Sequence, residues 1–334
     1  MEKPKVSIIV PVYNVEQYIE RCAVSLFEQT YSDIEYVFVN DCTPDHSVDV
    51  LKRVLSRYPQ RSDQVKIINH DHNRGIAATR NTALDNCTGD FVCYADSDDL
   101  VELNAVELLV NRQMASNADI VTGMALMQTP NDQILLPHPH YNTKEEMVLD
   151  MMQLTINHAL WRRLIRKSLY DEFQIKAKEG VNCGEDCLQM TQLAYYASSF
   201  SFVDEVVYHY DCTRDDSYMT SVNREAKKKR VIDDIKTADL IIDFFKDKEQ
   251  VYYDEANRVA AKYIKLILKN SAKAGDFALF DDMRTRLKSF DKKYWNAIGW
   301  DKSVRRVLSQ NYHLRRVVHF FDRVYNKILS FRYK

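Results

Sequence analysis

Glycine and proline are scarce in this sequence, with 7 of each among 334 residues. Disordered segments, collagen-like chains and long flexible linkers are rich in one or both of these residues, so the composition argues against all three. The hydrophobic fraction is 46% and the charged fraction is 28%, which is typical of a globular protein with a sizeable core. The length exceeds that of one ordinary domain and suggests about two.

Cysteine pairs with the spacing of a structural metal site are also lacking. The seven cysteines form an odd and scattered set without a CxxC pair, and Cys183 with Cys187 has no matching second pair for zinc. We therefore expect reduced and largely buried thiols, as in cytosolic proteins.

Long apolar runs are missing as well. No stretch approaches the roughly 18 apolar residues that a membrane-spanning helix needs. The apolar run near the N-terminus is too short for the core of a secretory signal peptide plus its cleavage site. These features predict a cytoplasmic protein. Its formal net charge of -2 gives no indication of nucleic-acid binding.

The first 120 residues alternate between β-branched runs and patterns of helical period. Such alternation predicts an α/β fold, with a Rossmann-like, mostly parallel sheet and helices on both faces. The expected strands are 6–13, 34–41, 65–70, 90–95 and 118–123, and the expected helices are 15–30, 47–58, 75–87 and 104–115.

The rest of the chain changes character twice. Residues 124–222 are less regular, and the pattern becomes helical from residue 224 onward, with apolar stripes at helical period. We therefore expect a C-terminal helical extension over 223–334, and the chain could form a homo-oligomer through its 224–300 region. Within 124–222 we expect a loop or hairpin near 128–140, helices near 144–154 and 185–198, and a strand at 201–210.

The last segment, 301–334, is basic and amphipathic. It holds nine Lys or Arg residues against two Asp, interspersed with aliphatic and aromatic side chains. A helix of this kind can lie in an anionic membrane surface, which would make the protein peripheral on the inner face of the cytoplasmic membrane. Alternatively, the segment packs on the protein or on a partner, and its charges are simply solvated.

Four loops follow expected strands and so share the edge of the sheet where ligands bind in folds of this kind. They read "PVYN" (11–14), "NDCTPD" (40–45), "HDHNRG" (70–75) and "ADSDD" (95–99). Tyr13 could stack on a base, whereas Asn14 could simply cap the next helix. Asp41 could accept hydrogen bonds from a base or a ribose. Arg80 could reach a nucleotide or form a salt bridge to the Asp cluster.

The fourth loop carries Asp96, Asp98 and Asp99 within four positions. Like charges this close repel one another unless a cation lies among them, although an Asp-rich turn with Asp99 capping a helix is the simpler explanation. Mg²⁺ and Mn²⁺ prefer oxygen ligands, and Mg²⁺ commonly takes one or two carboxylates plus phosphate oxygens. A glycine-rich dinucleotide fingerprint and a GxxxxGK[ST] loop are both absent. A diphosphate held through a divalent cation is therefore the favoured ligand.

Taken together, "VSIIVPVYNVEQYIERCAVSLFEQTYSDIEYVFVNDCTPDHS", "NRGIAATRNTAL" and "TGDFVCYADSDD" resemble the family-2 glycosyltransferases with the GT-A fold, of the bacterial surface-polysaccharide type. The resemblance is strong over about 4–125 and looser to about 222. It implies a catalytic domain at 1–222, with a nucleotide-sugar half at about 1–123 and an acceptor half at about 124–222. It also implies a nucleoside diphosphate sugar donor, usually UDP-linked, and inversion at the anomeric carbon.

The resemblance assigns roles to individual residues. Asn40 departs from the family pattern, which commonly has an acid at that position. Asp98 and Asp96 would hold Mn²⁺ or Mg²⁺. The nucleotide-sugar site would include Pro11, Val12, Tyr13, Asn14, Asp41, Asn73, Arg80, Asp96 and Ser97.

The stretch "EGVNCGEDCLQM" (179–190) resembles the family segment with an acidic pair. Its Asp is the catalytic base, a role that we carry to Asp186, although spacing alone would not choose between Glu185 and Asp186. Both could instead stabilise the start of a helix. Trp161 could line the site or be ordinary core, and Asp99 and His209 are further candidates.

The implied reaction is a single displacement with Asp186 as the base and no acid catalyst. We expect a saccharide or lipid-linked saccharide as acceptor, in polysaccharide or glycan biosynthesis. Two alternatives stay open, which are a catalytically inactive sugar-nucleotide-binding protein of the same fold and a nucleotidyltransferase.

Overall fold

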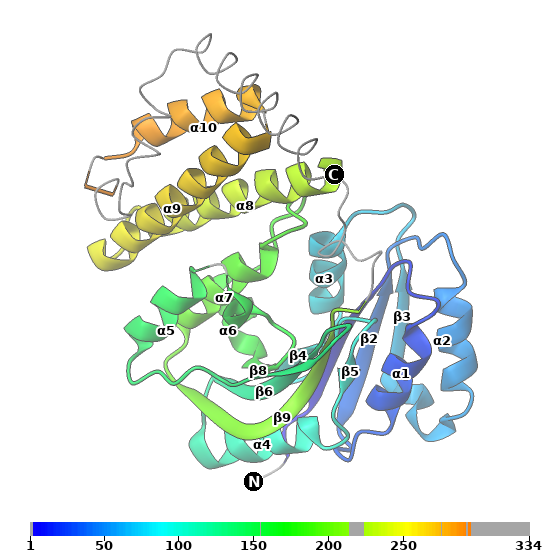
Figure 1. Cartoon of the computed structure of the whole chain (residues 1–334). Helices are drawn as coiled ribbons and strands as arrows, with labels where there is room; N and C mark the ends of the chain where they lie inside the picture. Colours follow the sequence, from blue (N-terminus) through cyan, green and yellow to red (C-terminus); the bar gives the residue numbers. More distant parts are fainter. Residues whose placement is uncertain (1–2, 154, 214–223, 275, 292, 295–334) are drawn as a thin grey trace. The chain divides into compact units, whose positions relative to one another are not determined.

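The computed structural model describes residues 3–153, 155–213, 224–274, 276–291 and 293–294 (Figure 1). Its described residues form two compact units, Met1–Thr237 and Ala238–Lys334. The basic tail expected at 301–334 lies outside the described residues. None of the described helices is both long and apolar enough to cross a membrane.

The larger unit is built on one curled sheet flanked by helices, as the alternating pattern predicts. The strands are β1 (Val6–Val12), β2 (Ile34–Asn40), β3 (Val65–Asn69), β4 (Phe91–Tyr94), β5 (Leu100–Val101), β6 (Ile120–Gln128), β7 (Gln133–Leu136), β8 (Arg163–Arg166) and β9 (Phe200–Asp211). The helices are α1 (Ile19–Phe27), α2 (Ser47–Leu55), α3 (Ile76–Asp85), α4 (Ala105–Ser116), α5 (Lys144–Met151), α6 (Lys167–Phe173) and α7 (Glu185–Tyr196), with short 3-10 turns η1 (Pro59–Gln64) and η2 (Ile156–His158).

The strand order is β3-β2-β1-β4-β8-β6-β9-β5, with β7 paired to β6. The four strands β3, β2, β1 and β4 are mutually parallel, so their carboxyl ends meet at one edge. The pair β6 and β9 is also parallel, whereas β8 runs antiparallel to both β4 and β6. The predicted α/β fold is therefore confirmed, with the antiparallel strand β8 joining the two parallel parts.

Residues of β1 alternate between two apolar layers. All seven are buried, as expected for a central strand covered on both faces. Ile8 and Val10 belong to the cluster that includes Ile19 and Leu26 of α1. The intervening Ile9 is fully buried outside that cluster, and α3 packs against β1 and β2. This packing fixes the strand ends that carry the four polar loops.

Two sequence expectations need correction here. The first helix begins at Ile19 rather than at residue 15, because Asn14 adopts a left-handed conformation with φ of 54° and residues 16–18 form a turn. Asn14 is therefore not the cap of that helix. Strands β5 and β8 and helix α6 were not expected at all.

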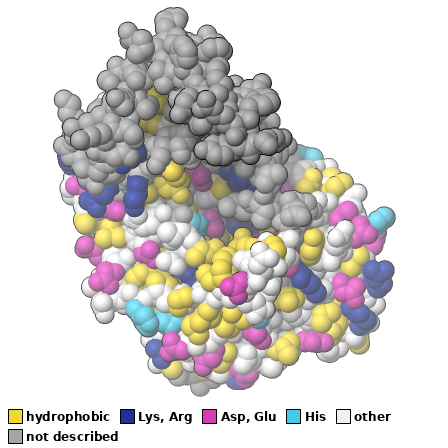
Figure 2. Space-filling model, viewed as in Figure 1, with side chains coloured by type: hydrophobic (Ala, Val, Ile, Leu, Met, Phe, Trp, Pro, Cys, Tyr) yellow, Lys and Arg dark blue, Asp and Glu magenta, His cyan; other side chains and the backbone are white. Residues whose placement is uncertain are grey.

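A long helix, α8 (Arg224–Phe245), runs from the larger unit into the second one, since the division after Thr237 falls within it. The second unit also contains α9 (Gln250–Ala274) and α10 (Phe277–Ser289), which pack against each other. The helical pattern predicted from residue 224 is thus observed. On the face drawn in Figure 2, acidic and basic side chains of the described residues are interspersed rather than gathered by sign.

Candidate active site

The loop between β4 and β5 presents its acidic residues alternately to the protein and to the outside. Ser97 and Asp99 are buried, whereas Asp96 and Asp98 are partly exposed. Asp99 accepts hydrogen bonds from the Tyr208 hydroxyl and from the Asp211 backbone N–H, each over 2.8 Å. Burial, with Asp98 and Asp96 adding to it, raises the pKa of Asp99 well above its ordinary value. Asp99 therefore anchors the loop, and Asp96 and Asp98 face outward.

Two further contacts hold this loop, and no local pattern in the sequence predicts either of them. Arg21 of α1 donates to the Asp98 carbonyl oxygen over 2.5 Å and pairs with the Asp211 carboxylate. The Asp96 backbone N–H donates to the Tyr208 hydroxyl over 3.0 Å. Because β9 and α1 both clamp the loop, its two outward carboxylates are held in a defined arrangement.

Arg80 of α3 bridges two of the predicted site residues. Its guanidinium lies 3.0 Å from Asp96 Oδ1 and 2.5 Å from Glu185 Oε1, and its side chain is 7% exposed. The salt bridge to the Asp cluster, one of the two roles considered for Arg80, is therefore observed. Burial raises the pKa of Glu185 to about 7, although the positive charge of Arg80 acts in the opposite direction.

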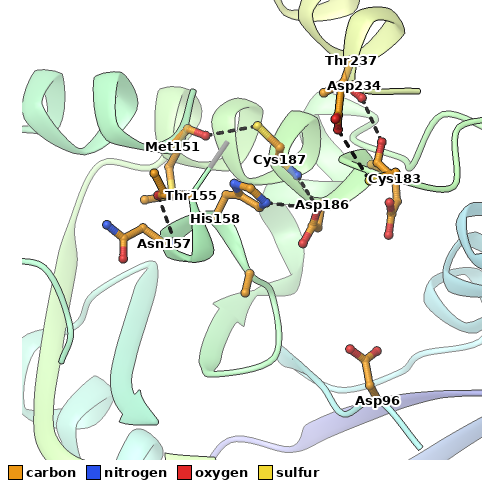
Figure 3. A network of polar contacts seen from close by, with 12 residues as sticks. Asp96, Met151, Thr155, Asn157, His158, Cys183, Asp186, Cys187, Asp234 and Thr237 are labelled. Carbon is orange, nitrogen blue, oxygen red and sulfur yellow. Dashed lines mark hydrogen bonds and ion pairs between the residues drawn. The ribbon is translucent and has the colours of Figure 1, made fainter. Parts of the chain in front are cut away.

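Asp186 lies in the first turn of α7, with 22% of its side chain exposed. Its Oδ1 accepts the backbone N–H of Cys187 over 2.9 Å and lies 3.6 Å from His158 Nε2. Burial raises the pKa of Asp186, with Arg80 opposing and Asp96 reinforcing this shift. In Figure 3 the carboxylates of Asp186 and Asp96 are directed toward one another from facing elements.

His158 is a site residue that sequence reasoning missed. Burial, together with the nearby charge of Arg163, lowers the pKa of its imidazole to about 4. The ring beside Asp186 is therefore neutral at physiological pH. Arg163 itself is fully buried and donates to the carbonyl oxygens of Asn157 and Ala159 on either side of His158. A lone His in an irregular segment offers no pattern by which this role could be found.

The loops after β2 and β3 are joined through Asp41, which is 3% exposed. Its carboxylate accepts the backbone N–H groups of Arg74 and Gly75, each over 2.8 Å, and lies 2.7 Å from His70 Nδ1. Gly75 has a φ of 87°, a conformation that favours glycine. Asp41 thus fixes the start of α3, where Asn73 is exposed.

The loop after β1 forms the rim of the same edge. Pro11 and Val12 are buried and pair with β2, whereas the side chain of Tyr13 is 47% exposed. Asn14 is exposed, and its backbone N–H donates to Thr43 Oγ1 over 2.9 Å. Tyr13, Asn14, Asn73, Asp96 and Asp98 therefore offer accessible groups around one strand edge.

Trp161 and His209 have protein partners. The Trp161 ring stacks on Tyr208 and Tyr210, with centroid distances of 4.6 and 5.4 Å, and belongs to the apolar core. His209 lies between these two tyrosines in β9, so it faces the opposite side of the strand. Its Nε2 lies 2.6 Å from Glu102 Oε1.

The Asp96–Asp98 pair offers the type of ligand atom that a hard divalent cation prefers. Both side chains offer carboxylate oxygens, and Arg80 pairs with Oδ1 of Asp96. Among the residues that the structure describes, no group of three or more His, Cys, Asp or Glu side chains could hold a metal ion. Mg²⁺ commonly takes only one or two carboxylates, with phosphate oxygens and water as its other ligands.

Comparisons with known proteins identify the family to which this chain is similar. A sequence model described as glycosyl transferase family 2 matches residues 7–174. The chain is 31% identical over 215 residues to the uncharacterized glycosyltransferase EpsJ of Bacillus subtilis, a match that covers 62% of this chain and 61% of the relative. It is 28% identical over 222 residues to a cholesterol galactosyltransferase of Borreliella burgdorferi, covering 62% and 60%. The matched part thus spans about three fifths of these relatives.

Solved structures share the fold at lower identity. Residues 1–349 of TarS from S. aureus, in complex with UDP-GlcNAc, give a TM-score of 0.55 at 19% identity, over 84% of this chain and 90% of that one. The mannosyltransferase PcManGT of Pyrobaculum calidifontis, in complex with GDP-Man and Mn²⁺, gives 0.53 at 17% identity, over 96% and 88%. The fold is therefore that of the GT-A glycosyltransferases, as the resemblance implied.

Proposed function

The chain belongs to glycosyl transferase family 2, and from this premise we propose that it is an inverting, metal-dependent glycosyltransferase. It moves a sugar from a UDP-sugar to a hydroxyl group of a saccharide or lipid-linked saccharide. The observation that carries the proposal is the bridge from Asp96 through Arg80 to Glu185, because it brings the loop after β4 next to the start of α7. A donor-binding loop and a general base are thereby held at one edge of the sheet.

The chemical step is a single displacement. The acceptor oxygen forms a bond to the anomeric carbon while the bond from that carbon to the diphosphate oxygen breaks, and the configuration inverts. Asp186 takes the proton of the acceptor hydroxyl, which is too weak an acid to lose it unaided. Because burial raises the pKa of Asp186, this carboxylate becomes protonated at a higher pH than an ordinary Asp. The protonated form cannot act as a base, so the rate should decrease as the pH falls.

The donor diphosphate needs positive charge beside the carboxylates of the loop after β4. Asp98 and Asp96 would hold Mn²⁺ or Mg²⁺, as either cation accepts carboxylate oxygens. A bound divalent cation stabilises negative charge on a departing diphosphate. Arg21 and Tyr208 also hold the loop through its backbone, at the Asp98 carbonyl oxygen and the Asp96 N–H.

We assign the nucleotide to the rim formed by the loops after β1, β2 and β3. The exposed ring of Tyr13 can stack on a base, and Asn14 and Asn73 offer polar groups nearby in the same set of loops. Asp41 is engaged by Arg74, Gly75 and His70, so its role includes shaping this rim. Ser97, between Asp96 and Asp98 in the sequence, is buried.

A donor screen tests the proposal. Purified protein with Mn²⁺ is offered UDP-glucose, UDP-galactose, UDP-GlcNAc, UDP-glucuronate and GDP-mannose in turn, and released nucleotide is measured. We expect release from at least one UDP-sugar. The Asp186→Asn variant should lower its rate by about 10²-fold or more, since this is the usual range for a general base. Binding of UDP with Mn²⁺ should stay within about twofold.

Other outcomes point to the alternatives. UDP binding without turnover of any donor by the wild-type chain would favour a non-catalytic binding protein. Release of pyrophosphate from a nucleoside triphosphate would favour a nucleotidyltransferase. Unchanged turnover in Asp186→Asn would show that the base is assigned wrongly.

The acceptor proposal extends to the membrane. Residues 301–334 carry nine Lys or Arg residues against two Asp, and basic amphipathic segments bind anionic lipid surfaces. We place the enzyme at such a surface, where a lipid-linked saccharide would be available. Flotation with vesicles that contain about 30% anionic lipid tests this binding, because such vesicles have a moderate negative surface potential. Deletion of 301–334 should abolish flotation, and unchanged flotation would refute the role of the tail.

A further inference from the structure

The segment that leads into the proposed catalytic base has little regular structure of its own. Residues 178–184 connect the end of the α6 region to α7, and both glycines in it, Gly180 and Gly184, have positive φ values of 80° and 79°. Gly184 directly precedes Glu185 and Asp186. The position of the base therefore depends on what holds residues 181–184.

One turn of α8 supplies that support from about fifty residues further along the chain. The backbone N–H of Asn182 donates to Asp233 Oδ2 over 3.2 Å. The Cys183 thiol lies 3.5 Å from Asp234 Oδ1, and the Thr237 hydroxyl donates to the Cys183 carbonyl oxygen over 3.3 Å. Figure 3 shows Asp234 and Thr237 reaching down from α8 to Cys183, beside Asp186.

Two of the three supporting side chains are buried, which makes their polar contacts significant. Asp233 is 1% exposed and Thr237 is fully buried. A buried carboxylate or hydroxyl without a hydrogen-bond partner is unfavourable. The Asp233 carboxylate and the Thr237 hydroxyl therefore stabilise the fold only while they bind the backbone of residues 182–183. Lys236 also lies 3.5 Å from Asp233, which partly balances its charge.

The packing at Gly184 shows how closely the two segments approach. A Cβ atom added to Gly184 would lie 3.0 Å from Thr237 Oγ1. Asn182 in turn touches the loop before α3, since a Cβ added to Gly75 would lie 2.5 Å from Asn182 Oδ1. Residues 182–184 are therefore confined between α8 and the start of α3.

We propose that the turn of α8 from Asp233 to Thr237 positions the catalytic base by fixing residues 182–184. Asp233, Asp234 and Thr237 contact Asn182 and Cys183 in the segment before the base, so they act as positioning residues. This inference rests on the proposed function, because it takes Asp186 as the base. It adds that the catalytic domain is completed by residues beyond the expected boundary at 222.

Thr237→Val is the variant that tests the proposal. Valine keeps the shape of threonine and removes the hydroxyl that binds the Cys183 carbonyl. Thr237→Ser keeps the hydroxyl, and Lys229→Ala changes an exposed residue of the same helix as a matched control. Hydrogen–deuterium exchange of residues 180–187 reports the order of the loop without any substrate. The kcat and KM are measured for the UDP-sugar that the wild-type chain turns over fastest.

We expect Thr237→Val to speed hydrogen–deuterium exchange at residues 180–187. It should lower kcat about tenfold, because small displacements of a catalytic group have effects of this size or larger. The KM for the donor should change less than about twofold. Thr237→Ser and Lys229→Ala should behave like the wild type. Unchanged exchange, unchanged kcat, or failure of Thr237→Ser to restore both would overturn the proposal.

Two safeguards keep the result interpretable. Should Thr237→Val fail to fold, Asp233→Ala removes the acceptor of the Asn182 N–H and is judged by the same criteria. Should no donor be turned over by the wild-type chain, the proposed function fails, whereas the exchange measurement still shows whether α8 fixes the loop.

Discussion

Asp96 and Glu185 share one counter-ion, because the guanidinium of Arg80 lies 3.0 Å from the first carboxylate and 2.5 Å from the second. Each carboxylate belongs to a different acidic motif, and the two motifs are far apart in the sequence. A single buried cation therefore sets the separation of the two parts of the proposed active site.

Replacing Arg80 with methionine should destabilise the protein strongly. Methionine retains much of the apolar volume but leaves Glu185 buried without its partner. Breaking a buried ion pair in this way typically lowers the free energy of unfolding by about 3 kcal/mol. Urea unfolding followed by tryptophan fluorescence measures the change.

The matched control for this prediction is Arg74→Met. Arg74 pairs with Glu179 over 3.3 Å at the surface, where the two side chains are 37% and 55% exposed. Such a pair contributes about 1 kcal/mol or less. Equal losses in the two variants would contradict the central role given to Arg80.

Glu185 should make the protein less stable as the pH rises. Burial raises the pKa of Glu185 from 4.5 to about 7, against the effect of Arg80. Between these values the folded chain keeps a proton that the unfolded chain has lost, so the free energy of unfolding falls with increasing pH. Glu185→Gln cannot ionise. The free energy of unfolding of this variant, relative to that of the wild type, should therefore increase from pH 5 to pH 8. A difference that is constant with pH would refute this.

His158 should have the opposite effect, on the acidic side. Burial, with the charge of Arg163, lowers the pKa of His158 from 6.5 to about 4. Below pH 6.5 the unfolded chain binds a proton that the folded chain does not, so the free energy of unfolding decreases as the pH falls toward 4. His158→Gln should remove up to about 3 kcal/mol of this acid sensitivity. Parallel stability curves for the two proteins would contradict the neutral, buried imidazole.

Tyr208 should stabilise the loop after β4. Its hydroxyl donates to Asp99 and accepts the Asp96 backbone N–H. Tyr208→Phe leaves both groups buried without this partner, at a cost of about 2 kcal/mol. Binding of UDP with Mn²⁺ should weaken as well. Tyr58→Phe removes an exposed hydrogen bond to Glu28 and should change stability by about 0.5 kcal/mol or less.

Asp98 should control the metal dependence. If Asp98 is a ligand of the cation, Asp98→Asn should reduce the thermal stabilisation by UDP in the presence of Mn²⁺, because that stabilisation reflects binding to the folded state. Asp85→Asn alters a surface pair with Lys176 and serves as the control. Equal ligand-induced shifts in wild type and Asp98→Asn would remove Asp98 from the proposed metal site.

The sequence was informative wherever a local pattern determines the structure. Alternating β-branched runs and helical stripes predicted β1 to β4 and their helices, since each of these elements buries a regular set of apolar residues. Strand β8 has no recognisable sequence pattern because it is short and begins with Arg163. This arginine is buried, whereas arginine is rarely buried in proteins. Its antiparallel place between β4 and β6 depends on long-range pairing, which no local pattern reveals.

The candidate site was predicted in the same uneven way. Asp96, Asp98 and Asp186 belong to recognisable motifs, and the salt bridge of Arg80 was one of two options considered. The buried contacts of Asp99 and the neutral ring of His158 arise only when distant segments meet in the fold. The sequence also could not tell that Asp41 is engaged by the backbone of the next loop.

Helix α8 belongs to both units, since Thr237 ends one and Ala238 begins the other. A chimaera that exchanges C-terminal regions between related enzymes should therefore be joined after Thr237 and not at the start of the helix. If the junction lies earlier in the helix, residues 233–237 come from the donor enzyme. Their contacts with Asn182 and Cys183 would then be lost or altered, and Asp186 would be displaced.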